Sequence, residues 1–140
     1  MATFDDALKK VLKHEGGYVC DSDDSGGETY RGISRRYNSS WDGWQIIDDY
    51  KRKYKGNALN KVLNSNDVLQ TKVKELYKDK YWDVFELDDI PNQNIAYQMF
   101  DTCVNCGQAA AIRFAQASLG ERIDGRWTLS LLHKLAAFKS

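Results

Sequence analysis

The acidic residues near the N-terminus have the types and spacing that catalysis by protonation needs. Glu15 ends an amphipathic run and is followed by Gly16-Gly17-Tyr18, and a polar loop at 21–29 carries three aspartates and Thr29. Cleavage of a glycosidic bond needs one carboxyl to protonate the leaving oxygen and a second group to manage water or the developing positive charge. We therefore predict that Glu15 is the general acid, with its pKa raised by partial burial. Asp24 is predicted to be an ionised carboxylate that stabilises the positive charge or orients water. Thr29 is predicted to hold that water.

Other interpretations of this loop are open. Aspartates in turns commonly bond to nearby backbone amides. In this interpretation the three aspartates only stabilise the turn. The corresponding interpretation of Glu15 is a surface carboxylate at a helix end, without a catalytic role. The run Asp21-x-Asp23-x-Ser25-Gly26 also matches the opening of an EF-hand calcium loop. That match fails at its twelfth position, where Gly32 replaces the bidentate glutamate, so we predict no metal site.

The composition excludes several classes of function. In 140 residues, twenty basic and twenty acidic side chains give a formal net charge of zero, so no global charge attracts nucleic acid or an anionic membrane. No apolar stretch is long enough to span a bilayer, and residues 1–6 show neither the basic nor the apolar region of a signal peptide. We expect a protein made in the cytoplasm that needs no cofactor, binds no nucleic acid, does not insert stably into membranes and works as a monomer.

The three cysteines are Cys20, Cys103 and Cys106. We expect free thiols, because the count is odd and no export signal is found. Cys103-x-x-Cys106 invites a zinc or redox interpretation, but a zinc site needs four ligands and no second paired motif is present. We predict that this pair serves packing, since cysteine also behaves as a small buried hydrophobe.

The elements that must position the acidic residues are predicted to be helical. A helix capped by Thr3 is indicated by apolar residues at helical spacing, namely Phe4, Ala7, Leu8, Val11 and Leu12. Gly16-Gly17 should end it in the left-handed conformation, which leaves Glu15 at a defined exit from a rigid element. Further helices are predicted over 44–54, from 67 to 77, from Pro91 to 104, over 109–119 and over 127–138, with a loop or short hairpin at 16–32 and a polar connector at 55–66. The fold class is therefore mainly α, in a single domain.

Several groups of residues resemble a known family. The runs Glu15-Gly16-Gly17-Tyr18-Val19, 24–29 and Gly32-Ile33-Ser34 are similar to the N-terminal signature of the glycoside hydrolase family 108 muramidases. Tyr77-x-x-x-Tyr81-Trp82-Asp83 and the run 100–107 resemble two later helices of that family. The likeness covers nearly the whole chain, and the motifs occur in the family's order.

The resemblance implies a lysozyme-like fold with a short hairpin near the N-terminus. It also implies hydrolysis of the β-1,4 bond between N-acetylmuramic acid and N-acetylglucosamine, with Glu15 matching the catalytic glutamate. The substrate would be the glycan strand of peptidoglycan, and the enzyme, of the phage or prophage endolysin type, would act on the cell wall or in the periplasm after release. We expect the glycan cleft to be lined, by aromatic stacking and amide hydrogen bonds, by Tyr18, Tyr30, Trp82 and Asn105.

The resemblance also implies an organisation along the chain. Residues 1–108 would form the muramidase region, and 109–140 a helical segment that resembles a shortened peptidoglycan-binding segment, packed in the same domain. Within it, residues 124–128 lack the second glycine of the usual turn. Two other functions stay open. One is a non-catalytic peptidoglycan-binding module, and the other is a lytic transglycosylase that uses Glu15 alone and releases 1,6-anhydro sugars.

Overall fold

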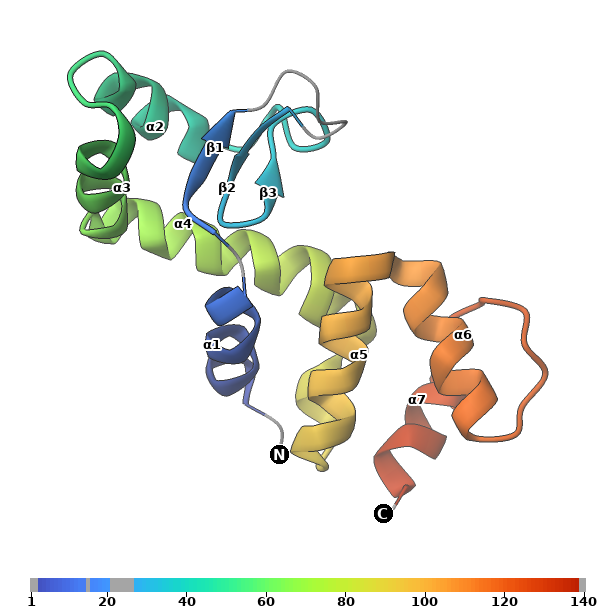
Figure 1. Cartoon of the computed structure of the whole chain (residues 1–140). Helices are drawn as coiled ribbons and strands as arrows, with labels where there is room; N and C mark the ends of the chain where they lie inside the picture. Colours follow the sequence, from blue (N-terminus) through green and yellow to red (C-terminus); the bar gives the residue numbers. More distant parts are fainter. Residues whose placement is uncertain (1–2, 15, 21–26, 139–140) are drawn as a thin grey trace. The chain divides into compact units, whose positions relative to one another are not determined.

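The computed structural model describes residues 3–14, 16–20 and 27–138. Contacts divide the chain into two compact units, which we call the helical unit, residues 1–9 and 77–140, and the sheet unit, residues 10–76. The described residues form seven α-helices and one small antiparallel sheet, so the predicted mainly-α class is confirmed (Figure 1). The organisation predicted around residue 108 stays a prediction. None of the helices in these described ranges is long and apolar enough to cross a membrane.

The first helix, α1 (Phe4–His14), forms where its apolar periodicity predicts it. Four of its five predicted apolar positions are buried, and only Leu12 is half-buried. Asp5 and Asp6 lie in the first turn, where a negative charge is favourable at the helix N-terminus. The Thr3 hydroxyl donates to the Asp6 carboxylate at 2.8 Å. Glu15 follows α1 directly in the sequence and lies outside the described residues.

A three-stranded antiparallel sheet occupies the predicted loop or hairpin region. Its strands β1 (Tyr18–Cys20), β2 (Glu28–Tyr30) and β3 (Ile33–Ser34) pair in the order β1-β2-β3. The β2–β3 turn consists of Arg31 and Gly32, both at positive φ. A two-residue hairpin turn needs positive φ at both positions when its backbone twist matches that of the strands. The strained arginine is held in place, because its Nη1 donates to Gln70 Oε1 at 2.6 Å.

Three helices complete the sheet unit: α2 (Gly43–Lys51), α3 (Gly56–Asn64) and α4 (Asp67–Tyr77). The prediction of a polar connector over 55–66 is wrong, because α3 occupies most of it. Only two apolar residues of α3, Leu59 and Leu63, are buried, so the helix depends on one short apolar stripe rather than on the longer periodicity that marks α1. In α4, Leu69 and Val73 are buried, whereas Val68 is 60% exposed.

The helical unit is built around aromatic rings. Trp82, Phe100 and Phe4 are buried and meet edge to face, with ring centroids 5.5–5.7 Å apart. Phe100 belongs to α5 (Gln93–Cys106), and Trp82 ends a π-helical turn, Lys78–Trp82, that follows α4. Two short 3₁₀ turns, Asp83–Phe85 and Leu87–Asp89, lead on to α5.

The start of α5 differs from the prediction. Pro91 was expected in the first helical turn, but it precedes the N-cap residue Asn92. The Asn92 side chain accepts hydrogen bonds from the backbone N–H groups of Asn94 and Ile95, at 3.0 and 3.1 Å. Proline lacks an N–H group and restricts the residue before it to extended conformations. It therefore suits the position just before the N-cap residue as well as the first helical turn.

The C-terminal part forms α6 (Gln108–Ser118) and α7 (Leu129–Ala137), close to the predicted bounds. The loop between them is organised by the buried Gln116. Its Nε2 donates to Asp124 Oδ1 at 2.8 Å, and its Oε1 accepts the backbone N–H groups of Asp124 and Gly125 at 3.1 and 3.0 Å. The Thr128 hydroxyl caps α7 by accepting from the Leu131 N–H group at 3.1 Å.

Candidate active site

Of the three predicted catalytic residues, one lies within the described residues. Glu15 and Asp24 are outside them, and Thr29 is the central residue of β2. The residues on both sides of these two positions are described: the end of α1 and Gly16 flank Glu15, and β1 and Gly27 flank the segment that holds Asp24. The contacts of these flanking residues therefore define the described part of the site.

The chain just after Glu15 is hydrogen-bonded to α3. The Tyr18 N–H group donates to Asn60 Oδ1 at 2.7 Å, and the Gly17 carbonyl accepts from the Arg31 N–H group at 3.3 Å. A Cβ atom at Gly17 would lie 2.4 Å from Asn60 Oδ1, so a side chain at this position would displace the amide that binds the Tyr18 N–H group. The predicted reason for the glycine pair is wrong, because neither Gly16 nor Gly17 has a positive φ. Close approach by Asn60 explains the second glycine instead.

The side chain of Tyr18 is also engaged. Its hydroxyl donates to Glu28 Oε2 at 2.6 Å, and the Lys51 ammonium lies 5.3 Å from the centre of its ring. Burial, followed by the hydrogen bond to Glu28, raises the pKa of Tyr18 to about 12. The phenol therefore keeps its proton, and remains a hydrogen-bond donor, throughout the neutral pH range.

Glu28 is the centre of a cluster of four charged side chains and one tyrosine, which we call the Glu28 cluster: Tyr18, Glu28, Arg35, Asp48 and Lys51. One Glu28 oxygen accepts from Arg35 Nη1 at 3.0 Å and the other from Lys51 Nζ at 2.7 Å, and the side chain is 14% exposed. Arg35 in turn binds both oxygens of Asp48, at 2.7 and 2.8 Å. The cluster joins β1, β2 and α2 through charge-assisted hydrogen bonds, which are stronger than neutral ones.

The carboxylates of this cluster are unsuited to donate a proton. Burial on its own would raise the pKa of Glu28, but hydrogen bonds from the lysine, the tyrosine and the arginine outweigh it and hold that pKa below its usual range. The hydrogen bonds from Arg35 lower the pKa of Asp48. A general acid needs a raised pKa so that it is protonated near neutral pH. Glu28 and Asp48 stay ionised there, so neither competes with Glu15 for that role.

Thr29 faces away from this cluster. Successive residues of a strand point to opposite sides, so Glu28 and Tyr30 share one face of β2 and Thr29 lies on the other. The pairing of the strands places Val19 and Ser34 opposite Thr29 on the same face. Val19 is 50% exposed, and Thr29 and Ser34 are half-buried, so this face of the sheet is partly open.

Two of the four residues predicted to contact glycan are fully buried. Tyr30 donates its hydroxyl to Asn64 Oδ1 at 2.7 Å and accepts from Gln70 Nε2 at 2.9 Å. Trp82 lies in the aromatic core of the helical unit, and its Nε1 donates to Asp88 Oδ1 at 2.9 Å. Stacking on a sugar requires an exposed ring face, so in this structure both residues serve packing rather than glycan contact.

Asn105 is the exposed member of that predicted set. It lies in the last turn of α5, and its Nδ2 donates to the carbonyl and the carboxylate of Asp101, at 2.9 and 3.1 Å. Asn105 and Trp82 belong to the helical unit, whereas Tyr18, Thr29 and Tyr30 belong to the sheet unit.

The two cysteines near the end of α5 differ from each other. Cys103 is buried, and burial raises the pKa of its thiol to about 11, as expected for an inert packing residue. Cys106 is exposed, so the packing role predicted for both holds only for Cys103. Across the described ranges, no group of three or more histidine, cysteine or acidic side chains could hold a metal ion.

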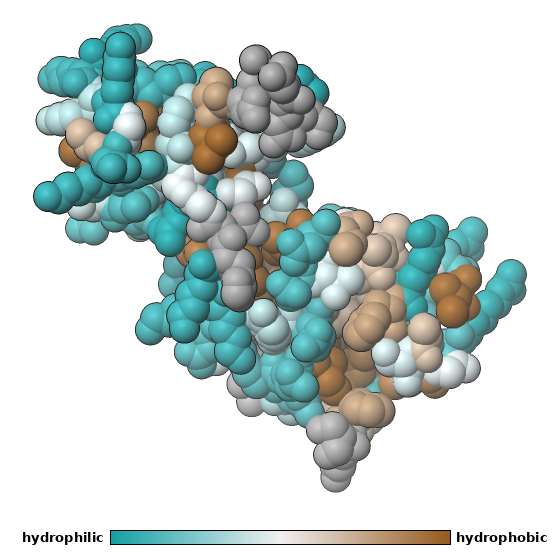
Figure 2. All heavy atoms as spheres, in the orientation of Figure 1, coloured by the Kyte–Doolittle hydropathy of each residue, from teal (hydrophilic) through white to brown (hydrophobic). Residues whose placement is uncertain are grey.

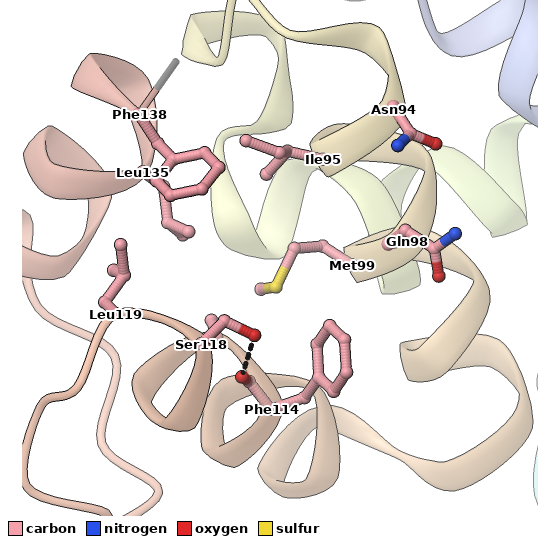
Figure 3. A pocket seen from close by; sticks show the side chains of 10 residues that line it. Asn94, Ile95, Gln98, Met99, Phe114, Ser118, Leu119, Leu135 and Phe138 are labelled. Atoms are coloured by element: carbon pink, nitrogen blue, oxygen red, sulfur yellow. Dashed lines mark hydrogen bonds between the residues drawn. The ribbon is translucent and has the colours of Figure 1, made fainter. Parts of the chain in front are cut away.

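The helical unit also contains an apolar pocket of about 200 Å³ between α5, α6 and α7. Ile95 and Met99 of α5 line it opposite Leu135, Leu119 contributes from just after α6, and Phe114 and Phe138 are half-exposed at its edge (Figure 3). Figure 2 shows apolar surface gathered over this part of the helical unit. No carboxylate lines the pocket, so it offers no group for acid catalysis, and no predicted site residue lies in it.

Comparison with known proteins decides the family. The sequence profile of the family described as Glycosyl hydrolase 108 matches residues 8–107. The chain belongs to this family. The match spans all seven predicted site residues and confirms the resemblance found in the sequence, and it makes the protein a glycoside hydrolase by family.

Among solved structures, this family 108 chain is similar to SagA of Brucella abortus. The two share 27% sequence identity with a TM-score of 0.66, over 97% of this chain and 70% of SagA. The likeness confirms the lysozyme-like, mainly-α fold. No curated protein matches the chain.

Proposed function

We propose that this family 108 protein is a peptidoglycan hydrolase that cleaves the β-1,4 bond between N-acetylmuramic acid and N-acetylglucosamine. The observation that carries the proposal is the family match over residues 8–107, which includes the Glu15-Gly16-Gly17 motif. Support from geometry comes from the chain that follows Glu15, since Tyr18 is fastened to Asn60. A catalytic acid has to be held at a fixed place relative to its substrate.

In this proposal Glu15 protonates the glycosidic oxygen as the bond breaks. Asp24 stays ionised and stabilises positive charge on the sugar or orients water, and Thr29 holds that water. Two features of the sheet unit support the assignment. Thr29 lies on the partly open face of the sheet, and the neighbouring carboxylates of Glu28 and Asp48 are held ionised by basic partners.

The glycan strand of peptidoglycan is the proposed partner, bound by a monomer that acts on the cell wall or in the periplasm after release, in the manner of an endolysin. Asn105 is the member of the predicted contact set with an exposed amide, and its Nδ2 is shared with Asp101 of the same helix. Because sugar hydroxyls both donate and accept, an amide of this kind can bind them. We assign no wall-binding role to the 109–140 segment.

Product analysis on purified peptidoglycan tests the function. The protein should release fragments with N-acetylmuramic acid at a free reducing end, detected by mass spectrometry after separation. Fragments that end in 1,6-anhydro sugars would identify a lytic transglycosylase instead. Binding to peptidoglycan without any new fragment would identify a non-catalytic module.

A pair of matched variants tests the acid. Glu15→Gln keeps the size of the side chain but cannot donate the proton, and should lower the rate by about 10²–10⁴-fold. Glu75→Gln makes the same chemical change at an exposed position of α4 and should leave the rate unchanged. If a folded Glu15→Gln protein keeps more than half of the wild-type rate, Glu15 is not the acid.

A further inference from the structure

Tyr18 was expected to stack on sugar, but its contacts point to a different role. The backbone N–H group is bound by Asn60 of α3 at 2.7 Å, and the hydroxyl is bound by Glu28 of β2 at 2.6 Å. The Lys51 ammonium of α2 lies over the ring at 5.3 Å. Both hydrogen-bond donors of Tyr18 are therefore bound to partners on two separate elements, α3 and β2, and a cation lies over its ring.

These contacts act on the chain next to two of the three proposed catalytic positions, Glu15 and Thr29. Tyr18 follows Glu15 by three residues, and three residues span at most about 10 Å, so fixing Tyr18 restricts the chain that leaves the acid. The hydroxyl reaches Glu28, the neighbour of Thr29 in β2. Glu28 is itself held by Lys51 and Arg35.

Resting on the proposed function, we propose that Tyr18 is a positioning residue for the glycosidase reaction: its hydroxyl and its N–H group hold the segment after Glu15 and the strand that carries Thr29. It is not a platform for sugar stacking. On the other side of Thr29, Tyr30 is fixed by Asn64 and Gln70, so both neighbours of that residue are anchored.

The contrast with Tyr37 supports this assignment. Tyr37, in the same unit, is 70% exposed and is assigned no role at the site. Tyr18 is half-buried, and its polar groups are occupied within the protein. A displacement of about 1 Å in a catalytic group can cost a factor of about 10² in rate, so small losses in anchoring have measurable effects.

Steady-state hydrolysis of a soluble oligomer of alternating N-acetylglucosamine and N-acetylmuramic acid tests the role. Tyr18→Phe keeps the ring and removes only the hydroxyl, and should lower kcat by about 10- to 100-fold with KM unchanged. Asn60→Ala should do the same, whereas Asn60→Asp retains an acceptor oxygen for the Tyr18 N–H group and should restore most of kcat. Tyr37→Phe is the matched control and should match the wild type.

The opposite pattern overturns the proposal. A sugar platform would tolerate Tyr18→Phe, because the ring is kept, and would show a raised KM in Tyr18→Leu. Wild-type kcat in Tyr18→Phe therefore refutes the positioning role. If Glu15→Gln is inactive while Tyr18→Phe is fully active, the proposed function stands and this inference alone fails. An active Glu15→Gln protein removes the function on which the inference rests.

Hydrogen exchange provides a readout that does not depend on activity. In the wild-type protein the Tyr18 amide should exchange about 10-fold or more slowly than an unprotected amide, because it is bound to Asn60. Asn60→Ala should remove that protection, and Tyr37→Phe should not. Unprotected exchange of this amide in the wild type would contradict the anchoring directly.

Discussion

In the sheet unit, the residues around the proposed catalytic positions are fixed by charged and polar side chains, whereas the helical unit is organised around aromatic rings. The Glu28 cluster joins β1, β2 and α2 through hydrogen bonds that have a defined direction. Trp82, Phe100 and Phe4 contribute buried area and edge-to-face packing. Burial of apolar area is the larger source of stability but has little direction. Directed hydrogen bonds contribute less stability but fix positions better, which suits the unit that carries Thr29 and the residues that follow Glu15.

The largest expected effect on stability lies in the aromatic core. Trp82→Ala should lower the free energy of unfolding by about 3–5 kcal/mol, because it removes a fully buried ring and leaves a cavity. Phe114→Ala removes a ring that is 50% exposed in the same unit and should cost much less. Urea unfolding of both variants measures the difference. Equal costs would mean that the aromatic core does not hold the helical unit together.

A smaller loss is expected in the Glu28 cluster. Glu28→Gln should lower the free energy of unfolding by about 1–3 kcal/mol, since it removes the closest carboxylate of Lys51, and the Glu28 side chain is only 14% exposed. The control is Asp49→Asn, which breaks an exposed pair with Arg52 and should change stability by less than about 0.5 kcal/mol. The comparison between the units breaks down if Glu28→Gln destabilises the protein as much as Trp82→Ala does.

The pH dependence of stability sharpens the same comparison. The pKa of Glu28 is lowered in the folded protein, so its stabilising contribution is complete above the pKa of the unfolded chain and is lost as the pH falls through the folded pKa. The unfolded reference for glutamate is about 4.3. Unfolding experiments between pH 7 and pH 2 should therefore show the difference between wild type and Glu28→Gln shrinking below about pH 4. Trp82→Ala should keep its deficit across that range, since no proton is involved.

The smallest effect is expected at Gln116, a buried polar residue of the helical unit. Gln116→Met keeps the volume but leaves the N–H groups of Asp124 and Gly125 without their acceptor. We expect a cost of about 1 kcal/mol, because these amides lie in a loop that water can reach. Hydrogen exchange should speed up within the loop between α6 and α7 and stay unchanged in α5. A general increase across the helical unit would show that Gln116 supports more than this loop.

The helices with long apolar periodicity could be predicted from the sequence, and so could the family. The α1 and α4 helices follow the expected ranges because several apolar residues recur at helical spacing in each. The short helix α3 could not be predicted in this way, since only Leu59 and Leu63 mark it. Its formation depends on tertiary packing, which local patterns do not report.

The candidate site was predictable in its residue types but not in its contacts. Nothing near Tyr18 in the sequence indicates Asn60, which lies 42 residues further along the chain. The alternation of side chains in β2 separates Thr29 from Glu28, but it becomes informative only once the strand is known. Trp82 and Tyr30 were assigned to glycan by their chemistry, and their burial is a property of the fold alone.

The close approach of Asn60 to Gly17 also constrains how this sequence can evolve. A side chain at position 17 would collide with the asparagine that holds the next residue, so a first mutation there loses an anchor before anything replaces it. A small residue at position 60 would make room, but it would leave the Tyr18 amide unbound. Neither single step keeps both contacts, so relatives should retain glycine and asparagine together or replace both. Two positions that far apart in the chain should therefore be inherited as a pair.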